Sequence, residues 1–376
     1  MRWLAAASLL TLLPGSAPGQ RAGGELAGAI ARGRAAMDEA MRAGAAPGAA
    51  VAVAVKGRMV WSDGFGLADL VRGTPVTTAT RFGVGSISKA LTLAAAISLA
   101  DDGLVDLDAP IERYIPDFPH RGHGVTIRRI AAHQSGISDT FANAHYYTTR
   151  HFDALADAYP GIASAPLIFE PGTRTAYATG LFTIVGRVLE VAAGSPYPEL
   201  MRQRVLGPAR MRATAPNDPR HATPDRTGFY VAREGGGFTP APPYDPSFKL
   251  PGAGFLATAE DLARFGAALL RPGLLSDRGR REMFTAVPLA DGTPAAYALG
   301  FQSLLEDGRR LLLQPGGGPG IAGWLAIYPD DDVIVAILAN ATGAPLGGEV
   351  RRAVAAGFLR PPAPVPPRRP PRAPPP

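Results

Sequence analysis

Residues 82–102 read FGVGSISKALTLAAAISLADD, and this stretch decides the fold because nearly all of its side chains are apolar. A helix that is apolar on every side is typical of the centre of a protein. We predict such a helix over residues 82–102, with Gly103 as the residue that ends it. Within it, Ser86 and Lys89 lie three positions apart and therefore share one face of the helix.

Ser86 and Lys89 form the only Ser-x-x-Lys pattern of the chain. A serine hydroxyl is a poor nucleophile until a base removes its proton, and a lysine shielded from water has a lowered pKa and can be that base. The first turn of a helix also offers free N–H groups to a developing oxyanion. The alternative is structural: Ser86 would cap the helix, and Lys89 would extend its ammonium group to solvent.

Lysine is rare in this sequence, since only Lys56, Lys89 and Lys249 occur among the 38 basic residues. Arginine stays charged in proteins, whereas a buried lysine can lose its proton. Lys56 precedes a glycine in a predicted hairpin turn, and Lys249 lies in a loop rich in proline and glycine, so we interpret both as solvated charges. Lys89 lies in the apolar stretch, which favours a functional role for it.

The composition excludes several classes of function. The chain has no cysteine, so it has neither disulfides nor a thiolate nucleophile. Its net charge of +6 comes from scattered basic residues without a basic, aromatic-rich stripe, and we expect no nucleic-acid partner. The six histidines form no His-Glu-x-x-His pattern, and no Gly-x-Ser-x-Gly elbow or Walker-type loop occurs. We therefore expect no metal and no cofactor.

Strand patterns lie at both ends of the chain, and helical patterns lie between them. Predicted strands cover residues 49–55, 59–65, 299–304, 310–314, 323–328 and 333–338, and predicted helices cover residues 25–44, 180–193, 198–205, 258–270 and 346–359. Thr258 is expected to cap its helix, with Asp261 at the third position. We predict an α/β (α+β) fold, in which an antiparallel sheet from the N- and C-terminal segments is flanked by helices. A helical subdomain is inserted over about residues 104–245.

Both ends of the chain lie outside this domain, which we place at residues 25–360. Residues 1–19 contain a basic start, a short apolar core and then small residues, which is the pattern of a cleaved signal peptide. The alternative is an uncleaved N-terminal anchor. We expect a periplasmic or secreted mature protein without a stable membrane span, because no later segment is long and apolar enough. The proline-rich residues 361–376 predict an extended, disordered tail.

Six segments in chain order resemble motifs of the serine β-lactamase-related and penicillin-binding-protein-like hydrolases, which include class C β-lactamases, D,D-peptidases and esterases. They cover residues 47–65, 82–89 (FGVGSISK), 130–137 (IAAHQSGI), 170–177 (EPGTRTAY), 254–263 (GFLATAEDLA) and 316–320 (GGGPG). Each motif alone is weak, whereas six in the right order are a strong signal. The resemblance spans roughly residues 47–340 and implies a β-lactamase/transpeptidase-like fold.

The resemblance implies a role for each matching residue. Ser86 matches the nucleophile, Lys89 its proton partner, and Tyr177 the tyrosine that passes a proton to the leaving group. Backbone N–H groups of Ser86 and Gly317 match the oxyanion hole, and Gly316 belongs to the same glycine run. A phenol beside an ammonium group is expected to have a lowered pKa. His133 and Ser135 lie only two residues apart in a loop, and we interpret them as scaffold and not as a Ser–His pair.

Two positions depart from the family pattern. Thr179 stands where the Tyr-x-Asn motif has its amide, and a hydroxyl makes only part of the hydrogen bonds of an amide. Gln314 stands where the Lys/His-Thr-Gly motif has its cation, and a neutral amide binds a carboxylate more weakly than a charged donor does. These departures disfavour efficient β-lactamase or D-Ala-D-Ala peptidase activity.

We therefore expect an exported serine hydrolase that forms an acyl-enzyme at Ser86 with a small-molecule or peptide substrate. The scissile bond would belong to an ester, an amide or a peptide. One alternative is a β-lactamase or D-Ala-D-Ala carboxypeptidase. Another is a catalytically weakened module that binds peptidoglycan fragments or peptides. The pattern leaves the oligomeric state open.

Overall fold

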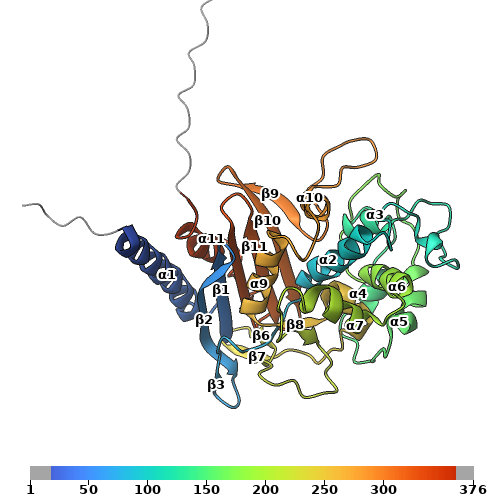
Figure 1. The fold of residues 1–376 in the computed structure, drawn as a ribbon. Helices are drawn as coiled ribbons and strands as arrows, with labels where there is room; N and C mark the ends of the chain where they lie inside the picture. Colours follow the sequence, from blue (N-terminus) through green and yellow to red (C-terminus); the bar gives the residue numbers. More distant parts are fainter. Residues whose placement is uncertain (1–17, 361–376) are drawn as a thin grey trace, which may run out of the picture.

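The computed structural model describes residues 18–360, with side chains from residue 24 onward, and its centre is a seven-stranded antiparallel sheet (Figure 1). The strand order is β3-β2-β1-β12-β11-β10-β9. The strands are β1 (Gly48–Val55), β2 (Arg58–Asp69), β3 (Thr74–Pro75), β9 (Gln302–Glu306), β10 (Arg309–Gly318), β11 (Ile321–Tyr328) and β12 (Val333–Ala339). The predicted sheet from the two ends of the chain is confirmed, because β1 pairs directly with β12.

Alternate residues of the two central strands face opposite sides of the sheet, as the twofold side-chain repeat of a strand requires. In β1, Ala52 belongs to the core between the sheet and the buried helices, whereas Val51 and Val53 belong to the core on the other side. The small alanine side chains of β1 allow the helix α9 (Ala259–Leu269) to approach the sheet closely. Gly266 of α9 also allows this approach, since a Cβ on Gly266 would lie 2.7 Å from the side chain of Ile334 in β12.

Two layers of helices cover the sheet (Figure 1). One face carries α1 (Pro18–Arg42) and α11 (Glu349–Ala356), and the other carries α9 (Ala259–Leu269), with α2 (Ile87–Asp101) beyond it. The first helix begins earlier than the predicted 25–44, and the last is shorter than the predicted 346–359. Thr258 caps α9 as predicted, since its hydroxyl accepts a hydrogen bond from the Asp261 amide at 3.1 Å.

The central helix begins later than predicted. Residues 82–102 were expected to be helical, but Phe82–Gly83 form the short strand β4, which pairs with β8 (Phe255–Ala257), and α2 begins at Ile87. The helix starts late because Gly85 has a φ of +52°, a left-handed conformation that interrupts a right-handed helix. From Ile87 to Ile97 every residue of α2 is buried, as the all-round apolar pattern predicts.

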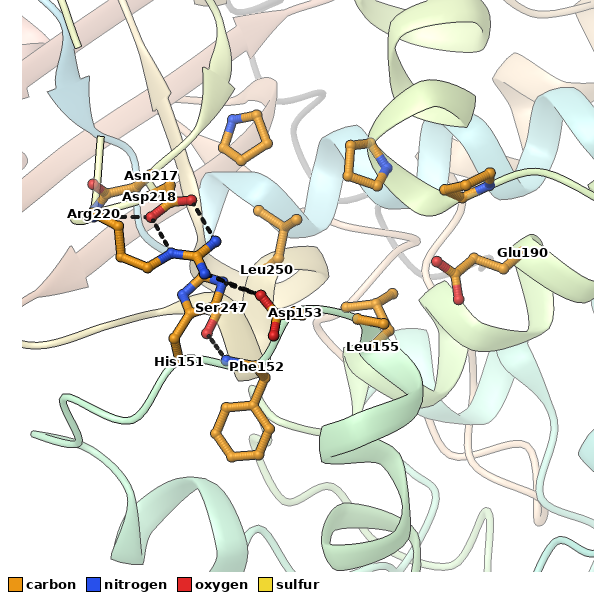
Figure 2. Close-up of a pocket in the computed structure, with 14 residues that line it drawn as sticks. His151, Phe152, Asp153, Leu155, Glu190, Asn217, Asp218, Arg220, Ser247 and Leu250 are labelled. Atoms are coloured by element: carbon orange, nitrogen blue, oxygen red, sulfur yellow. Dashed lines mark hydrogen bonds and ion pairs between the residues drawn. The ribbon is translucent and has the colours of Figure 1, made fainter. Parts of the chain in front are cut away.

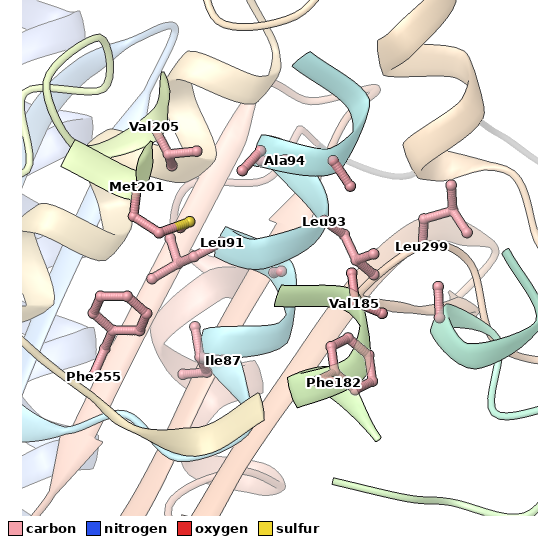
Figure 3. Packing of buried hydrophobic residues seen from close by; sticks show 14 of the residues in the cluster. Ile87, Leu91, Leu93, Ala94, Phe182, Val185, Met201, Val205, Phe255 and Leu299 are labelled. Carbon is pink, nitrogen blue, oxygen red and sulfur yellow. The ribbon is translucent and has the colours of Figure 1, made fainter. Parts of the chain in front are cut away.

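The middle of the chain supplies the helices that enclose α2 (Figure 3). Leu91 of α2 lies among Met201, Val205 and Phe255, and Phe182 lies on the other side of the helix. The helices of this region are α3 (Ile127–Ala131), α4 (Thr140–Ala144), α5 (Leu155–Ala163), α6 (Phe182–Ala193) and α7 (Tyr197–Met201), and α7 continues as one wider turn over Arg202–Leu206. Further short elements are β5 (Ala215–Pro216), β6 (Tyr230–Ala232), β7 (Phe238–Pro240), α8 (Leu250–Ala253) and α10 (Asp277–Phe284).

The predicted signal segment (residues 1–19) lies outside the described residues except for its last two, and the predicted tail (residues 361–376) lies wholly outside them. Within residues 18–360, no helix has the length and apolar character needed to cross a bilayer.

Strand β10 is longer than the predicted 310–314 and carries the glycine run to the start of α2. It pairs with β9 only as far as Leu313, and beyond that point no other strand among residues 18–360 pairs with this edge of β10. Pro315, which lacks an N–H, is therefore tolerated there. Gly316 approaches the residues before α2 so closely that a Cβ on it would lie 2.0 Å from the carbonyl oxygen of Val84. At Gly317, by contrast, a Cβ would meet nothing within 4 Å.

This difference gives a matched pair of variants. We expect Gly316→Ala to lower the free energy of unfolding by about 2 kcal/mol, because the backbone around Val84 must move to admit the methyl group. Gly317→Ala should change it by less than about 0.5 kcal/mol. Urea unfolding followed by circular dichroism measures both, and equal stability of the two variants would contradict the close approach.

Candidate active site

Ser86 is the residue immediately before α2, and its side chain is not used to cap the helix. It occupies the N-cap position, but its side chain makes no capping hydrogen bond, so the interpretation of Ser86 as a helix cap is wrong. Its Oγ lies 3.0 Å from Nζ of Lys89 and 2.6 Å from the hydroxyl oxygen of Tyr177. The structure thus brings together the three residues that the resemblance named as catalytic.

Lys89 lies one turn into α2 and is 1% exposed, which excludes the alternative that its ammonium group extends to solvent. Nζ donates to three acceptors: Ser86 Oγ at 3.0 Å, Thr179 Oγ1 at 3.0 Å and the Gly252 carbonyl at 3.1 Å. Burial lowers the pKa of Lys89 to about 7, although the negative charge of Asp139 opposes this shift. At neutral pH a large share of Lys89 is therefore uncharged and can accept a proton.

Tyr177 reaches Ser86 from the segment that precedes α6. Its ring is half exposed at 49%, yet its hydroxyl points inward and donates to Ser86 Oγ. Burial of the hydroxyl raises the pKa of Tyr177, so the expectation of a lowered pKa is wrong. The desolvation of a phenolate outweighs what its neighbours contribute. Tyr177 is consequently a neutral proton donor in the resting site.

The imidazole ring of His133 packs against the ring of Tyr177. The two rings lie with their centroids 4.3 Å apart, and Nδ1 of His133 accepts a hydrogen bond from the Ala178 amide at 3.2 Å. Burial and the nearby Lys89 charge lower the pKa of His133 to about 3, so the ring is neutral at ordinary pH. No hydrogen bond joins it to a serine within residues 18–360, and it acts as scaffold, as the sequence indicated.

Asp139 is a site residue that the sequence reasoning missed. Its carboxylate accepts hydrogen bonds from the amides of Thr179 at 2.7 Å and Gly180 at 3.0 Å, which fixes the turn that follows Tyr177. Burial raises the pKa of Asp139, an effect that the amides and the Lys89 charge oppose. Asp139 follows the 130–137 segment by two residues, so extending that motif could have identified it.

The predicted oxyanion residues lie beside Ser86. A Cβ on Gly85 would be 2.6 Å from the Gly317 nitrogen, which places the backbone of the glycine run against the residue before the nucleophile. The Ser86 amide has no backbone acceptor among the described residues, so its N–H is available. Two N–H groups near one hydroxyl can stabilise a tetrahedral oxyanion.

Gln314 does not face a substrate. It is buried, and its Nε2 donates to the carbonyl oxygens of Ser86 at 3.1 Å and Pro315 at 3.0 Å. The side chain that replaces the family's cation therefore ties β10 to the nucleophile segment. Neither of its two amide hydrogens is left for a carboxylate.

Lys249 is not the solvated charge that the sequence predicted. It is only 5% exposed, and its Nζ lies 4.8, 5.1 and 5.8 Å from the ring centroids of Tyr146, Phe248 and Tyr244. The loop composition around Lys249 indicated exposure, but aromatic residues distant in sequence cover it. Lys56 is the lysine in the hairpin turn between β1 and β2, as predicted.

A hollow of about 320 Å³ lies on the helical side of the molecule (Figure 2). Its lining includes His151, Asp153 and Arg220, whereas Ser86, Lys89 and Tyr177 do not line it. Arg220 already binds Asp153 and Asp218 there. Among residues 18–360, no group of three or more His, Asp or Glu side chains could hold a metal ion.

Comparison with known proteins places this chain in a family. The family model described as Beta-lactamase matches residues 34–358. The mitochondrial Serine beta-lactamase-like protein LACTB of Homo sapiens is 27% identical over 293 residues, which are 60% of this chain and 53% of that protein. A D-aminopeptidase of Cereibacter sphaeroides is 32% identical over 260 residues, which are 68% of this chain and 49% of that protein. The chain thus spans about half the length of these curated relatives.

Solved structures share the fold. The octameric penicillin-binding protein homologue from Pyrococcus abyssi matches with a TM-score of 0.76 and 22% identity, over 87% of this chain and 77% of that one. A D-stereospecific amidohydrolase from Streptomyces sp. matches with a TM-score of 0.71 and 24% identity, over 88% and 98%. The predicted β-lactamase/transpeptidase-like fold is therefore confirmed, and the chain belongs to the Beta-lactamase family of serine hydrolases.

Proposed function

We propose that this protein hydrolyses an ester, amide or peptide substrate through an acyl-enzyme at Ser86, and that it does so outside the cytoplasm. The observation that carries the hydrolytic part is the joint contact of Ser86 Oγ with Lys89 Nζ and the Tyr177 hydroxyl, at 3.0 and 2.6 Å. A nucleophile between a buried amine and a phenol has both a base and an acid within reach. The export part rests on the signal pattern of residues 1–19.

The proton transfers of acylation follow from these contacts. Neutral Lys89 takes the Ser86 proton as Oγ bonds to the substrate carbonyl, and the N–H groups of Ser86 and Gly317 hold the oxyanion. Tyr177 then gives its proton to the leaving group as the bond to that group breaks. The acyl-enzyme is left with a Lys89 ammonium and a Tyr177 phenolate, and their opposite charges stabilise each other.

Deacylation reverses the roles. The Tyr177 phenolate takes a proton from water, whose oxygen attacks the ester carbon. Lys89 returns its proton to Ser86 Oγ as the ester bond breaks, which restores the resting site. All protons are accounted for by Lys89 and Tyr177, so the cycle requires no further acid or base.

The position of Gln314 bears on the substrate class. Its amide is engaged by the carbonyls of Ser86 and Pro315, so the β10 edge offers no cation to a substrate carboxylate. β-Lactams and peptides ending in D-Ala-D-Ala therefore lack, at β10, the carboxylate contact that the family's motif would give them, which favours esters and amides that are bound in another way. The similarity to a D-aminopeptidase supports amides and peptides of D-amino acids as a further test set.

Covalent labelling tests the nucleophile. We expect a fluorophosphonate probe to add one label to the protein and to stop the hydrolysis of 4-nitrophenyl butyrate. Ser86→Ala should lose both labelling and turnover, whereas Ser88→Ala is the matched control and should keep both. Intact-protein mass spectrometry measures the label. Labelling of Ser86→Ala, or turnover by it, would assign the chemistry to another residue.

The pH profile tests the base. Burial lowers the pKa of Lys89 to about 7, and only the deprotonated form accepts the Ser86 proton, so kcat/KM should rise with pH and level off above an apparent pKa near 7. His133, with a pKa of about 3, stays neutral throughout. Lys89→Met should lower kcat/KM at least ~100-fold and remove this dependence. A flat wild-type profile between pH 5.5 and 8.5 would rule out Lys89 as the base.

A further inference from the structure

The cluster formed by Lys249, Tyr146, Tyr244 and Phe248 holds a buried ammonium group without an ion-pair partner among the described residues. Lys249 Nζ lies within 6 Å of all three ring centroids, which is cation–π distance. Within residues 18–360, Nζ makes no hydrogen bond and no ion pair, whereas the Lys89 ammonium has three acceptors. Burial and the neighbouring Lys89 charge lower the pKa of Lys249 to about 8.

The nearby carboxylates are occupied by other partners. Asp139 acts on Lys249 only at a distance, and its oxygens accept the amides of Thr179 and Gly180. Asp245 binds His151 at 2.7 Å and the Ser247 amide at 2.8 Å. Since a buried charge is costly unless it is paired, the three donors of Lys249 are available to an incoming anion.

The cluster adjoins the catalytic residues. Lys249 immediately precedes α8, whose Gly252 carbonyl accepts a hydrogen bond from Lys89. On the other side, the Tyr244 hydroxyl oxygen would lie 3.8 Å from a Cβ on Gly318, at the end of the glycine run. Tyr146 is 38% exposed and brings the cluster to the surface. The cluster thus adjoins α8 through Lys249 and the end of β10 through Tyr244.

We propose that Lys249, within the cluster that it forms with Tyr146, Tyr244 and Phe248, binds a carboxylate carried by the substrate. This inference rests on the proposed hydrolase function and specifies its substrate class: esters or amides with a negative charge. The cation that Gln314 does not supply on β10 is then supplied by Lys249, directly before α8. An ammonium group favours an anion there and repels a cationic ligand, although aromatic rings alone would favour a cation.

Matched substrates test the proposal. One pair carries the charge on the acyl chain (4-nitrophenyl hemiglutarate and its methyl ester), and a second pair carries it on the leaving group (the butyrate ester of 5-hydroxy-2-nitrobenzoate and its methyl ester). For at least one pair we expect wild type to prefer the anion. Lys249→Met should raise KM for that anion at least tenfold while changing KM for the neutral ester and kcat less than twofold.

Two variants control for charge and folding. Lys249→Arg keeps the charge and should retain most of the preference for the anion. Lys56→Met removes a lysine that lies far from the site. Strand pairing places Gly317 level with Ala49, at the start of β1, whereas Lys56 follows Val55, at the end of β1. Lys56→Met should leave all four KM values unchanged. Equal effects of Lys249→Met on charged and neutral esters, or no anion preference in wild type, would overturn the proposal.

A binding measurement separates this inference from the hydrolase function. In Ser86→Ala, which cannot turn over, titration calorimetry with the anionic ester of each pair should detect, for at least one of them, binding that disappears in Ser86→Ala/Lys249→Met. If the wild type hydrolyses no ester but this difference persists, the hydrolase proposal fails and the carboxylate site stands. If both proteins bind the anion equally or not at all, the carboxylate site fails, whatever the activity.

Discussion

The buried ammonium group of Lys89 is the interaction on which the site depends. Its three acceptors come from three separate parts of the chain: Ser86 at the start of α2, Thr179 after Tyr177, and Gly252 in α8. A buried amine that lost one of these acceptors would keep the full cost of desolvation without the compensating bond. The same hydrogen bonds therefore fix the site's geometry and hold its base in an environment where the amine can lose its proton.

Backbone contact limits how the remaining parts can be arranged. The β10 glycines and the turn at Gly85 lie so close that side chains on Gly316 or Gly85 would collide with main-chain atoms. The amide of Gln314 adds a hydrogen bond to the Ser86 carbonyl across the same junction. The sheet edge and the helix start consequently form one rigid unit, which presents N–H groups to Ser86 without the reorganisation that a mobile loop would need.

The sequence predicted most of the architecture and part of the site. The apolar residues of α2, the strands at both chain ends and the cap at Thr258 follow from periodicity and local chemistry. The early helix start at Phe82 was wrong because Gly85 adopts a left-handed conformation that depends on contact with β10. Lys249 was misjudged for a similar reason: its local sequence is that of a loop, and its burial comes from Tyr146 and Tyr244. Contacts between residues distant in sequence determine the start of α2 and the burial of Lys249, and the local sequence pattern does not predict such contacts.

Lys89 and Lys249 have different electrostatic roles in the proposed site. Lys89, with a pKa near 7 and three neutral acceptors, can pass between its charged and uncharged forms during catalysis. Lys249 has a pKa of about 8 and faces aromatic rings, so a bound carboxylate would stabilise its charged form. The charge of Asp139 opposes the lowering of both lysine pKa values, but its oxygens accept hydrogen bonds from backbone amides and not from either lysine.

A substrate carboxylate at Lys249 would add a negative charge near Lys89 and so favour the protonated form of Lys89. Substrate recognition therefore lowers the fraction of Lys89 that is unprotonated at neutral pH and able to accept a proton, which favours a carboxylate held at the outer, Tyr146 side of the cluster.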